Sequence, residues 1–376
     1  MTTTSDIDVV CLGESMVTFL PARPGPLADV PSFDRAIGGA ESNVACTLAR
    51  AGHRARWVSR VGADGFGDHL VRTIAAHGVD TTAVERDPER PTGIYFRTDG
   101  ERATGTADPA THQAALSEVL YYRAGSAASA MSPANVPPRA LHAGRVLHLT
   151  GITAALSADC LALLRALTSA RTPTGTGGGL GPLVSFDVNY RVGLWCTRTA
   201  PEPGPEVLRE LARHSDIVFV GEDEAAAAWG VTGGPEAVRE LLREPAVLVV
   251  KQGSAGATAF VGDGNAVFAP ALRVDVVSPV GAGDAFAAGF LAGTLRGLPI
   301  RERLRHGHLM AAAALTDAGD LAAPAALDVA DRLVALDDDS WGRLRLGPGW
   351  TVRGSHAAAA GQADEPGEQE PEVRSV

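Results

Sequence analysis

The sequence predicts an α/β fold: a three-layer αβα sandwich around a mainly parallel sheet, with a small β-sheet lid. Short, almost continuously apolar runs alternate with amphipathic or alanine-rich stretches along most of the chain, as expected for buried parallel strands joined by helices. Two polar, turn-rich stretches interrupt this alternation. With 376 residues and 45% hydrophobic content, the chain can bury a large core in one main domain.

The apolar runs predict buried strands, and the stretches between or after them predict helices. Their order, strand then helix, is typical of right-handed crossover units in a parallel sheet. Strands are expected over residues 7–13, 55–61, 146–151, 183–188, 217–220 and 246–250. Helices are expected over residues 42–51, 65–77, 158–170, 205–214, 235–243, 284–296, 301–318 and 329–336.

The two stretches that break the alternation lie at about 17–35 and 92–123. Both contain strand-like pieces, such as 93–97 and 119–123, and we expect them to form a small sheet over the open edge of the main one. Because ligands of such folds bind beyond the carboxyl ends of the strands, a lid there would exclude water from a reaction.

The packed domain is expected to span residues 1–345. Two segments are expected not to pack into it: an insertion within this range and a tail after it. Residues 171–182 contain five glycines and predict a flexible surface insertion. No strand precedes this insertion and no Lys-Ser or Lys-Thr follows it, so it is not a phosphate-binding loop. Residues 354–376 carry five acidic side chains and one arginine, which predicts a disordered acidic tail.

Composition argues against several functional classes. A net charge of −11 does not favour nucleic acid or an anionic membrane as a partner. No run of about 18 apolar residues occurs, and the N-terminus lacks a basic, apolar leader, so we expect neither a membrane span nor export and place the protein in the cytoplasm.

The cysteines and histidines predict neither disulfides nor a zinc site. The four cysteines are far apart and contain no CxxC pair, which predicts free thiols; they are Cys11, Cys46, Cys160 and Cys196. His306 and His308 are two residues apart in a helical stretch and would face different sides, so they do not predict a metal pair.

The most informative motif is the run Val280-Gly281-Ala282-Gly283-Asp284, which opens an apolar helix. Glycines let the backbone approach a ligand closely, and the free amides of a helix N-terminus favour an anion. Asp284, in the first turn, could accept a proton from a hydroxyl while those amides stabilise a transferring phosphoryl group. The alternative is a glycine-rich turn with an aspartate cap.

A second motif combines Gly38 and Gly39 with Asn43 at the start of another helix. The glycines allow the backbone to lie against a sugar, and the Asn43 amide offers a donor and an acceptor to hydroxyl groups. A plain turn and helix cap is the alternative for this motif.

Two arginines indicate an acidic substrate. Tyr121-Tyr122-Arg123 ends the predicted lid, and Arg191 follows a predicted strand in Phe186-Asp187-Val188-Asn189-Tyr190-Arg191. Guanidinium groups match a carboxylate bidentately, and a neutral hexose would not require two of them. The alternative is that both arginines pair with surface acids.

Taken together, the motifs at 38–45, 61–67 and 279–286 resemble the two signatures of the ribokinase-like (PfkB) carbohydrate kinases. The similarity spans roughly residues 9–336 and is strongest to the 2-keto-3-deoxygluconate kinases of that family. It implies that the sugar acid is held by a set of side chains and backbone positions from both halves of the chain: Gly38, Gly39, Asn43, Tyr95, Tyr121, Arg123, Arg191 and Asp320. An ordinary helix-end aspartate is the alternative for Asp320.

The same resemblance implies ATP and Mg²⁺. Glu224 corresponds to a glutamate that organises magnesium through water, although Gly221 replaces the usual asparagine before it. Lys251 and Gly253 match a segment beside the phosphates and ribose, and residues 281–284 supply the anion hole and the base. Ser278 stands where many relatives have a cation-binding aspartate, so we expect weak or absent potassium activation.

The expected function is therefore ATP-dependent phosphorylation of a terminal hydroxyl of a sugar acid, with 2-keto-3-deoxygluconate as the expected substrate. A kinase of a neutral sugar or a nucleoside, and a non-catalytic sugar-sensing relative, are the alternatives. The resemblance also implies possible homodimers, or higher oligomers, formed through the lid.

Overall fold

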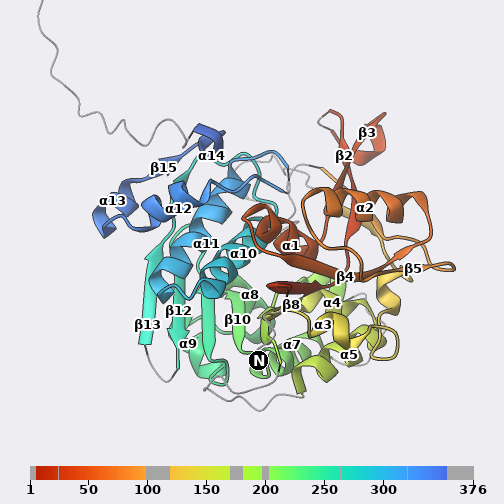
Figure 1. Cartoon of the computed structure of the whole chain (residues 1–376), viewed down its shortest axis with the longest axis horizontal. Coiled ribbons are helices and arrows are strands. Elements are labelled where there is room, and N and C mark those ends of the chain that lie inside the picture. Colours follow the sequence, from red (N-terminus) through yellow and green to blue (C-terminus); the bar gives the residue numbers. More distant parts are fainter. Residues whose placement is uncertain are drawn as a thin grey trace, which may run out of the picture.

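The fold is built around one nine-stranded sheet (Figure 1). The computed structural model describes residues 6–23, 25–98, 119–169, 181–196, 203–262, 265–319 and 321–353. The strand order is β13-β12-β11-β10-β9-β8-β1-β4-β5, parallel from β11 to β5, with β12 and β13 antiparallel at one edge. The strands are β1 (Val9–Leu12), β4 (Ala55–Gly62), β5 (Val84–Asp87), β8 (Val146–Thr150), β9 (Leu183–Asp187), β10 (Ile217–Gly221), β11 (Val247–Lys251), β12 (Gly256–Val261) and β13 (Asn265–Pro270).

Helices cover both faces of this sheet, because its central strands are apolar on both sides. In β1, Val10 and Leu12 join one buried cluster, while Val9 and Cys11 join another on the opposite face. The first cluster lies against α3 (Pro138–Leu141), α4 (Gly151–Leu156), α5 (Ala158–Ser169), α7 (Gly204–Arg213), α8 (Glu222–Trp229) and α9 (Gly234–Leu241). The second lies against α1 (Ala40–Arg50), α2 (Gly65–Ala76), α10 (Ala282–Leu295) and α11 (Ile300–Leu315).

A second, four-stranded sheet projects from the main body beside α2 (Figure 1). Its order is β3-β2-β6-β7, formed by β2 (Met16–Pro21), β3 (Phe33–Gly38), β6 (Ile94–Arg97) and β7 (Val119–Tyr122). Because β2 begins soon after β1 ends, this lid sheet starts at the carboxyl edge of the main sheet. Phe19 stacks on Phe96 at 4.8 Å between ring centroids, and Tyr95 stacks on Tyr121 at 5.4 Å.

The C-terminal elements form a small third cluster on the outside of α11. The Trp341 side chain is fully buried there, and its indole N–H donates to the carbonyl of Pro270 at 2.9 Å. Ordered structure therefore continues past residue 345. The remaining elements are α6 (Val192–Cys196), α12 (Leu327–Val334), α13 (Asp338–Arg343), α14 (Trp350–Arg353), β14 (Arg273–Val274), β15 (Arg345–Leu346), and the short 3-10 helices η1 (Leu27–Asp29) and η2 (Ala128–Ala130).

The predicted fold class is confirmed: a mainly parallel sheet between helical layers, with a small additional sheet. The prediction missed β12 and β13, whose antiparallel pairing depends on the turn-forming Gly262, and it missed β5, a short and mostly polar edge strand. The predicted insertion at 171–182 and acidic tail at 354–376 lie largely or wholly outside the described residues.

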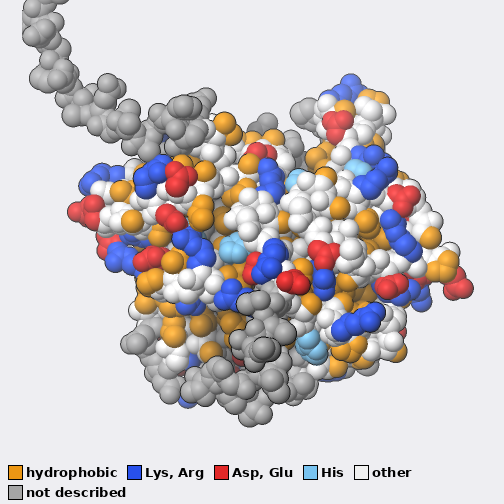
Figure 2. Space-filling view, in the orientation of Figure 1, with side chains coloured by type: hydrophobic (Ala, Val, Ile, Leu, Met, Phe, Trp, Pro, Cys, Tyr) orange, Lys and Arg blue, Asp and Glu red, His pale blue; other side chains and the backbone are white. Residues whose placement is uncertain are grey.

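The surface and helix lengths add two observations. Figure 2 shows basic and acidic side chains interspersed over the visible face, with no large area of one sign.

Among the helices of the described ranges, none is both long enough and apolar enough to cross a bilayer.

Candidate active site

The candidate site lies at the carboxyl edge of the main sheet, where parallel strands all end on the same side. Asp187 is the last residue of β9, Lys251 is the last residue of β11, and Glu224 lies in the first turn of α8, directly after β10. The N-terminus of α10 reaches the same place: a Cβ atom added to Gly283 would lie 3.8 Å from the Lys251 Nζ. Residues from four separate segments therefore meet here.

Lys251 and Asp187 form a buried ion pair. The Lys251 ammonium donates to both carboxylate oxygens of Asp187, at 3.0 and 3.1 Å, and only 3% of the Asp187 side chain is exposed. Burial alone would lower the pKa of Lys251, but the charges of Asp187, Glu224 and Asp284 raise it above its usual value. The lysine thus stays positively charged at neutral pH, next to the amides of α10.

The glycine motif before α10 has the conformation that the sequence predicts. Gly281 is the N-cap residue with φ 73°, a left-handed conformation that favours glycine. Asp284 lies in the first turn of the 14-residue helix and is partly exposed. A carboxylate and several helix amides are therefore presented together, beside the Lys251 charge.

The two glycine motifs meet through Asn43 and Asp284. The Asn43 amide nitrogen donates to the Asp284 Oδ2 at 2.9 Å, although the residues are 241 positions apart. The Asn43 Oδ1 is buried and has no hydrogen-bond partner. Gly39, just before α1, has no room for a side chain, because a Cβ atom would lie 2.4 Å from the carbonyl oxygen of Glu14.

The lid contributes Tyr95, Tyr121 and Arg123. The Tyr95 side chain, in lid strand β6, is buried, and its hydroxyl oxygen lies 2.2 Å from where a Cβ atom on Gly38 would stand. The Arg123 guanidinium is 5.7 Å from the centroid of the Tyr121 ring and pairs with the buried Glu14. Gly38 ends β3 of the same lid sheet, so this close approach packs two strands of the lid against each other.

Arg191 and Glu224 lie close together. Their side chains form an ion pair of 3.7 Å, and the Glu224 Oε2 accepts from the Gly221 backbone N–H at 2.9 Å. Glu224 is therefore also a helix-capping carboxylate for α8. The alternative that these arginines pair with surface acids is not what the structure shows, because Arg123 and Arg191 pair with the largely buried Glu14 and Glu224. Their contact with a substrate stays a prediction.

The sequence reasoning did not assign roles to several residues that the structure places here. Asp187 ends a buried strand in the same segment as Arg191, so its position at a strand end could have indicated a site residue. Asn189 is the only non-glycine residue of the described chain with a positive φ, 41°, and its Oδ1 is buried without a hydrogen-bond partner. Non-glycine residues with a positive φ cluster at active sites and ligand-binding sites. Glu14 and Glu41 are also buried.

Asp320 lies outside the described residues. Gly253 is in an exposed turn with φ 57°, and a Cβ atom there would meet nothing within 4 Å.

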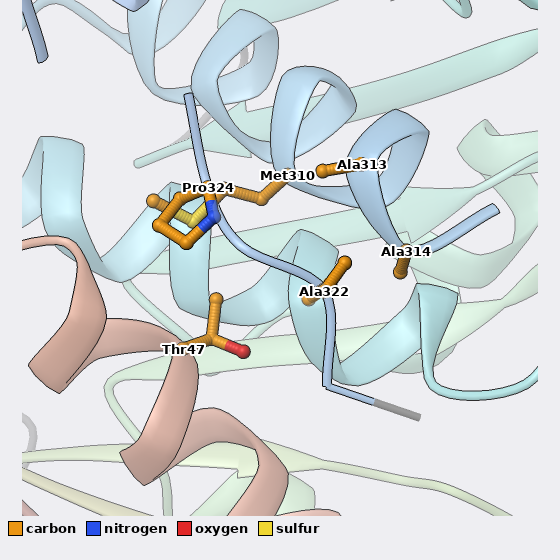
Figure 3. Close-up of a pocket in the computed structure, with 7 residues that line it drawn as sticks. Thr47, Met310, Ala313, Ala314, Ala322 and Pro324 are labelled. Atoms are coloured by element: carbon orange, nitrogen blue, oxygen red, sulfur yellow. The ribbon is translucent and has the colours of Figure 1, made fainter. Parts of the chain in front are cut away.

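A small pocket lies next to the first turn of α10, between α1, α10 and α11 (Figure 3). Small or apolar side chains line it: Thr47, Ala285, Met310, Ala313, Ala314, Ala322 and Pro324. Because it contains no charged group, it does not provide recognition of an acid or a phosphate. The charged groups lie at the neighbouring strand ends and at the N-terminus of α10.

The residues present fit magnesium held largely by a nucleotide. No group of three or more histidine, cysteine or acidic side chains in the described ranges could hold a metal ion by itself. Magnesium at phosphoryl-transfer sites usually keeps several waters and takes one or two carboxylates together with substrate phosphates. Glu224 can supply such a carboxylate.

Comparison with known proteins identifies a family. Residues 6–326 match the family described as pfkB family carbohydrate kinase. The chain is 35% identical over 219 residues to a 2-dehydro-3-deoxygluconokinase of Bacillus subtilis (strain 168), covering 57% of this chain and 60% of that protein. It is 28% identical over 220 residues to a probable fructokinase-4 of Arabidopsis thaliana, again covering 57% and 60%.

A solved structure matches over a longer range. The PfkB protein from Polaromonas sp. JS666 has 32% sequence identity and a TM-score of 0.71, covering 88% of this chain and 100% of that one. The curated relatives are matched over only about three fifths of their length. The family match nevertheless spans most of the sequence, including the lid, both glycine motifs and the strand ends that hold Asp187 and Lys251. The chain therefore belongs to the pfkB family of carbohydrate kinases.

Proposed function

We propose that this protein is an ATP-dependent kinase that phosphorylates a terminal hydroxyl of a sugar acid, with 2-keto-3-deoxygluconate as its substrate. The observation that carries the kinase assignment is the position of Asp284: it lies in the first turn of α10 and within 2.9 Å of the Asn43 amide. Lys251 supplies positive charge beside the same helix N-terminus. A base, a hydroxyl-binding amide and an anion site are thus combined.

In this proposal Asp284 accepts the proton of the sugar hydroxyl as that oxygen attacks the γ-phosphorus of ATP. A bond forms between the sugar oxygen and phosphorus, the bond to the β-phosphate oxygen breaks, and ADP leaves with the electron pair. The amides of Gly283 and its neighbours, with Lys251, stabilise negative charge on the transferring group. Asn43 orients the Asp284 carboxylate, and the lid excludes water.

Mg²⁺, when bound, neutralises charge on the phosphates, and Glu224 would hold it through water. Arg191 lies 3.7 Å from that glutamate. In this proposal one acid-binding arginine therefore lies next to the phosphate end of the site, and the other, Arg123, lies directly after the lid strand β7.

Two features support an acidic substrate. Arg123 lies between Glu14 and the Tyr121 ring, so its guanidinium plane is supported on one side. A 2-dehydro-3-deoxygluconokinase is also among the relatives above 30% identity. Planar, supported guanidinium groups are well suited to bidentate binding of a carboxylate.

A neutral-sugar kinase is the second candidate. The pairing of both arginines with acids, Glu14 and Glu224, favours it, because each pair is formally neutral. The match to a fructokinase supports the same alternative. The alternative of a non-catalytic sugar sensor has less support, since a sensor has no need of the Asp284 base.

A magnesium-dependent ADP-release assay over sugar acids and neutral sugars tests the proposal. We expect turnover with 2-keto-3-deoxygluconate at a kcat/KM at least about tenfold above that for fructose or ribose, as one charge-assisted contact would give. A preference for fructose would support the second candidate. ATP binding without turnover of any sugar would support the sensor.

A further inference from the structure

Glu14 lies where the chain passes between the main sheet and the lid sheet. Within the described residues, four connections join the lid sheet to the main body, at residues 13–15, 38–39, 91–93 and 123–126, and Glu14 lies close to the other three. A Cβ atom on Gly93 would lie 2.9 Å from the Glu14 Oε1, and one on Gly39 would lie 2.4 Å from its carbonyl oxygen. Glu14 itself is only 2% exposed.

The Glu14 carboxylate is held on the lid side by two residues that follow β7. The Ser126 hydroxyl donates to the Glu14 Oε1 at 2.5 Å, and Arg123 pairs with the other oxygen through its Nη2. The serine is 112 positions away in the chain. The carboxylate is therefore fixed by the fold before any ligand binds.

This contact uses only some of the N–H donors of the Arg123 guanidinium group. Its side chain is 12% exposed, and its Nε is buried without a hydrogen-bond partner. An arginine has five N–H donors in a rigid plane, and one carboxylate cannot satisfy them all. The ring of Tyr121 lies 5.7 Å from the guanidinium and limits its rotation.

We propose that Glu14 is a positioning residue that holds the Arg123 guanidinium in the orientation needed to bind the carboxylate of the sugar acid. This inference rests on the proposed function, because it assigns that carboxylate to Arg123. A buried carboxylate is costly to maintain and often does not raise stability over an apolar residue. Glu14 thereby sets the preference for acids over neutral sugars without contacting the reacting atoms.

Glu14→Gln is the direct test, because it keeps the shape and can still accept from Ser126. Its NH₂ group would face the Arg123 Nη2, and two donors cannot bond to each other, so the guanidinium loses its orientation. We expect the KM for 2-keto-3-deoxygluconate to rise about 10- to 100-fold, the range for a lost charge-assisted hydrogen bond, with kcat within about threefold of wild type.

The matched ligand is the neutral ketose in which a CH₂OH group replaces the carboxylate. Its KM should change less than about threefold in Glu14→Gln, because no carboxylate is present to be bound by Arg123. In an Arg123→Ala background, adding Glu14→Gln should likewise change the KM for the acid less than about threefold, since coupled residues are not additive. Equal losses for acid and neutral ketose would show a purely structural role and overturn the inference.

Ser126→Ala provides a milder variant in case Glu14→Gln does not fold. It removes one hydrogen bond to the same carboxylate and adds no charge, so we expect about a threefold rise in the KM for the acid alone. Wild-type protein that binds no sugar acid by calorimetry would overturn the proposed function and this inference together. Wild-type protein that binds the acid, with all these variants unchanged toward it, would overturn this inference only.

Discussion

The strand-end half of the site and the lid half are built in different ways. At the strand ends, Asp187 and Lys251 are held on central strands of a sheet covered on both faces, and their charges are mutually paired. In the lid, Tyr121 and Tyr122 lie on an edge strand and are 45% and 58% exposed. Glu14 and Arg123 form the connection between the two halves.

This difference has a physical basis. Phosphoryl transfer needs charges at fixed positions, and a close-packed sheet core supplies them because it resists displacement. Substrate entry and release need a part that can move, and exposed edge elements with few buried contacts open at low cost. We therefore expect changes at the strand ends to act mainly on turnover, and changes in the lid to act mainly on sugar affinity.

The largest effect is expected at Asp284, the proposed base. Asp284→Asn removes the proposed proton acceptor but keeps the size and the contact region of the side chain, so kcat should fall about 10² to 10⁴-fold. ATP affinity, measured by calorimetry, should stay within about threefold. Asp68→Asn is the matched control, because Asp68 is also a first-turn aspartate but lies on α2, with 62% of its side chain exposed. Full activity in Asp284→Asn would disprove the assignment.

Removing the strand-end lysine should have the next largest effect. Lys251→Met deletes the ammonium beside Gly283 and leaves Asp187 buried without its cation. We expect kcat/KM for ATP to fall about 10² to 10³-fold, as for other charge-stabilising groups, and stability to fall by about 3 kcal/mol in denaturant unfolding. A variant that is only less stable, with normal turnover when folded, would make Lys251 a purely structural residue.

Replacing Arg191 tests whether this residue belongs to the sugar-binding half of the site or to the strand-end half. If it binds the sugar acid, Arg191→Ala should raise the KM for 2-keto-3-deoxygluconate about tenfold, the effect of losing one ion-paired hydrogen bond, and leave the KM for the neutral ketose nearly unchanged. If it serves only to neutralise Glu224, 3.7 Å away, the magnesium dependence should shift equally with both sugars. Steady-state kinetics at several magnesium concentrations separate these results.

The contact between Gly38 and Tyr95 within the lid sheet should give a smaller effect. In Gly38→Ala the new methyl group would collide with the Tyr95 hydroxyl, so Tyr95 must move within the lid sheet, and we expect the sugar KM to rise about three- to tenfold. Adding Tyr95→Phe removes the colliding oxygen and should recover part of that loss. No recovery in the double variant would mean that the collision with Tyr95 is not the cause.

The smallest effect concerns stability and pH at Glu41. Burial raises the pKa of the Glu41 carboxyl above 4.5, in spite of hydrogen bonds from Thr153 and Thr150 that lower it. The native state therefore binds this proton more tightly than the unfolded state, and its stabilising contribution is lost as pH rises from 4.5 through the folded-state pKa. Glutamine resembles the protonated acid and does not titrate.

The melting temperature of Glu41→Gln relative to wild type should accordingly increase with pH across this window and then level off. Thermal melts between pH 4 and pH 8 measure it. Glu85→Gln, at an exposed position in β5, is the matched control and should show no such trend. A difference that falls with rising pH would contradict the raised pKa.

How far the sequence alone determined this protein can be judged from particular elements. The apolar runs predicted β1, β4, β8, β9, β10 and β11 because a strand buried on both faces must be apolar throughout. The glycine motif at 281–284 predicted the start of α10, because φ 73° at Gly281 favours glycine. These features are local, and local residues suffice to determine them. The same holds for the family resemblance, which depends on short motifs in order.

Only the tertiary structure decided which charges meet. The pairs Lys251–Asp187 and Arg123–Glu14 join strand ends and connections that are far apart in the chain, and no local pattern indicates them. The Asn43 contact to Asp284 likewise spans 241 positions. The pairing of buried charges depends on the order and register of the strands, which result from packing of the whole domain. The acid that each arginine pairs with is therefore decided by that packing and not by the local sequence.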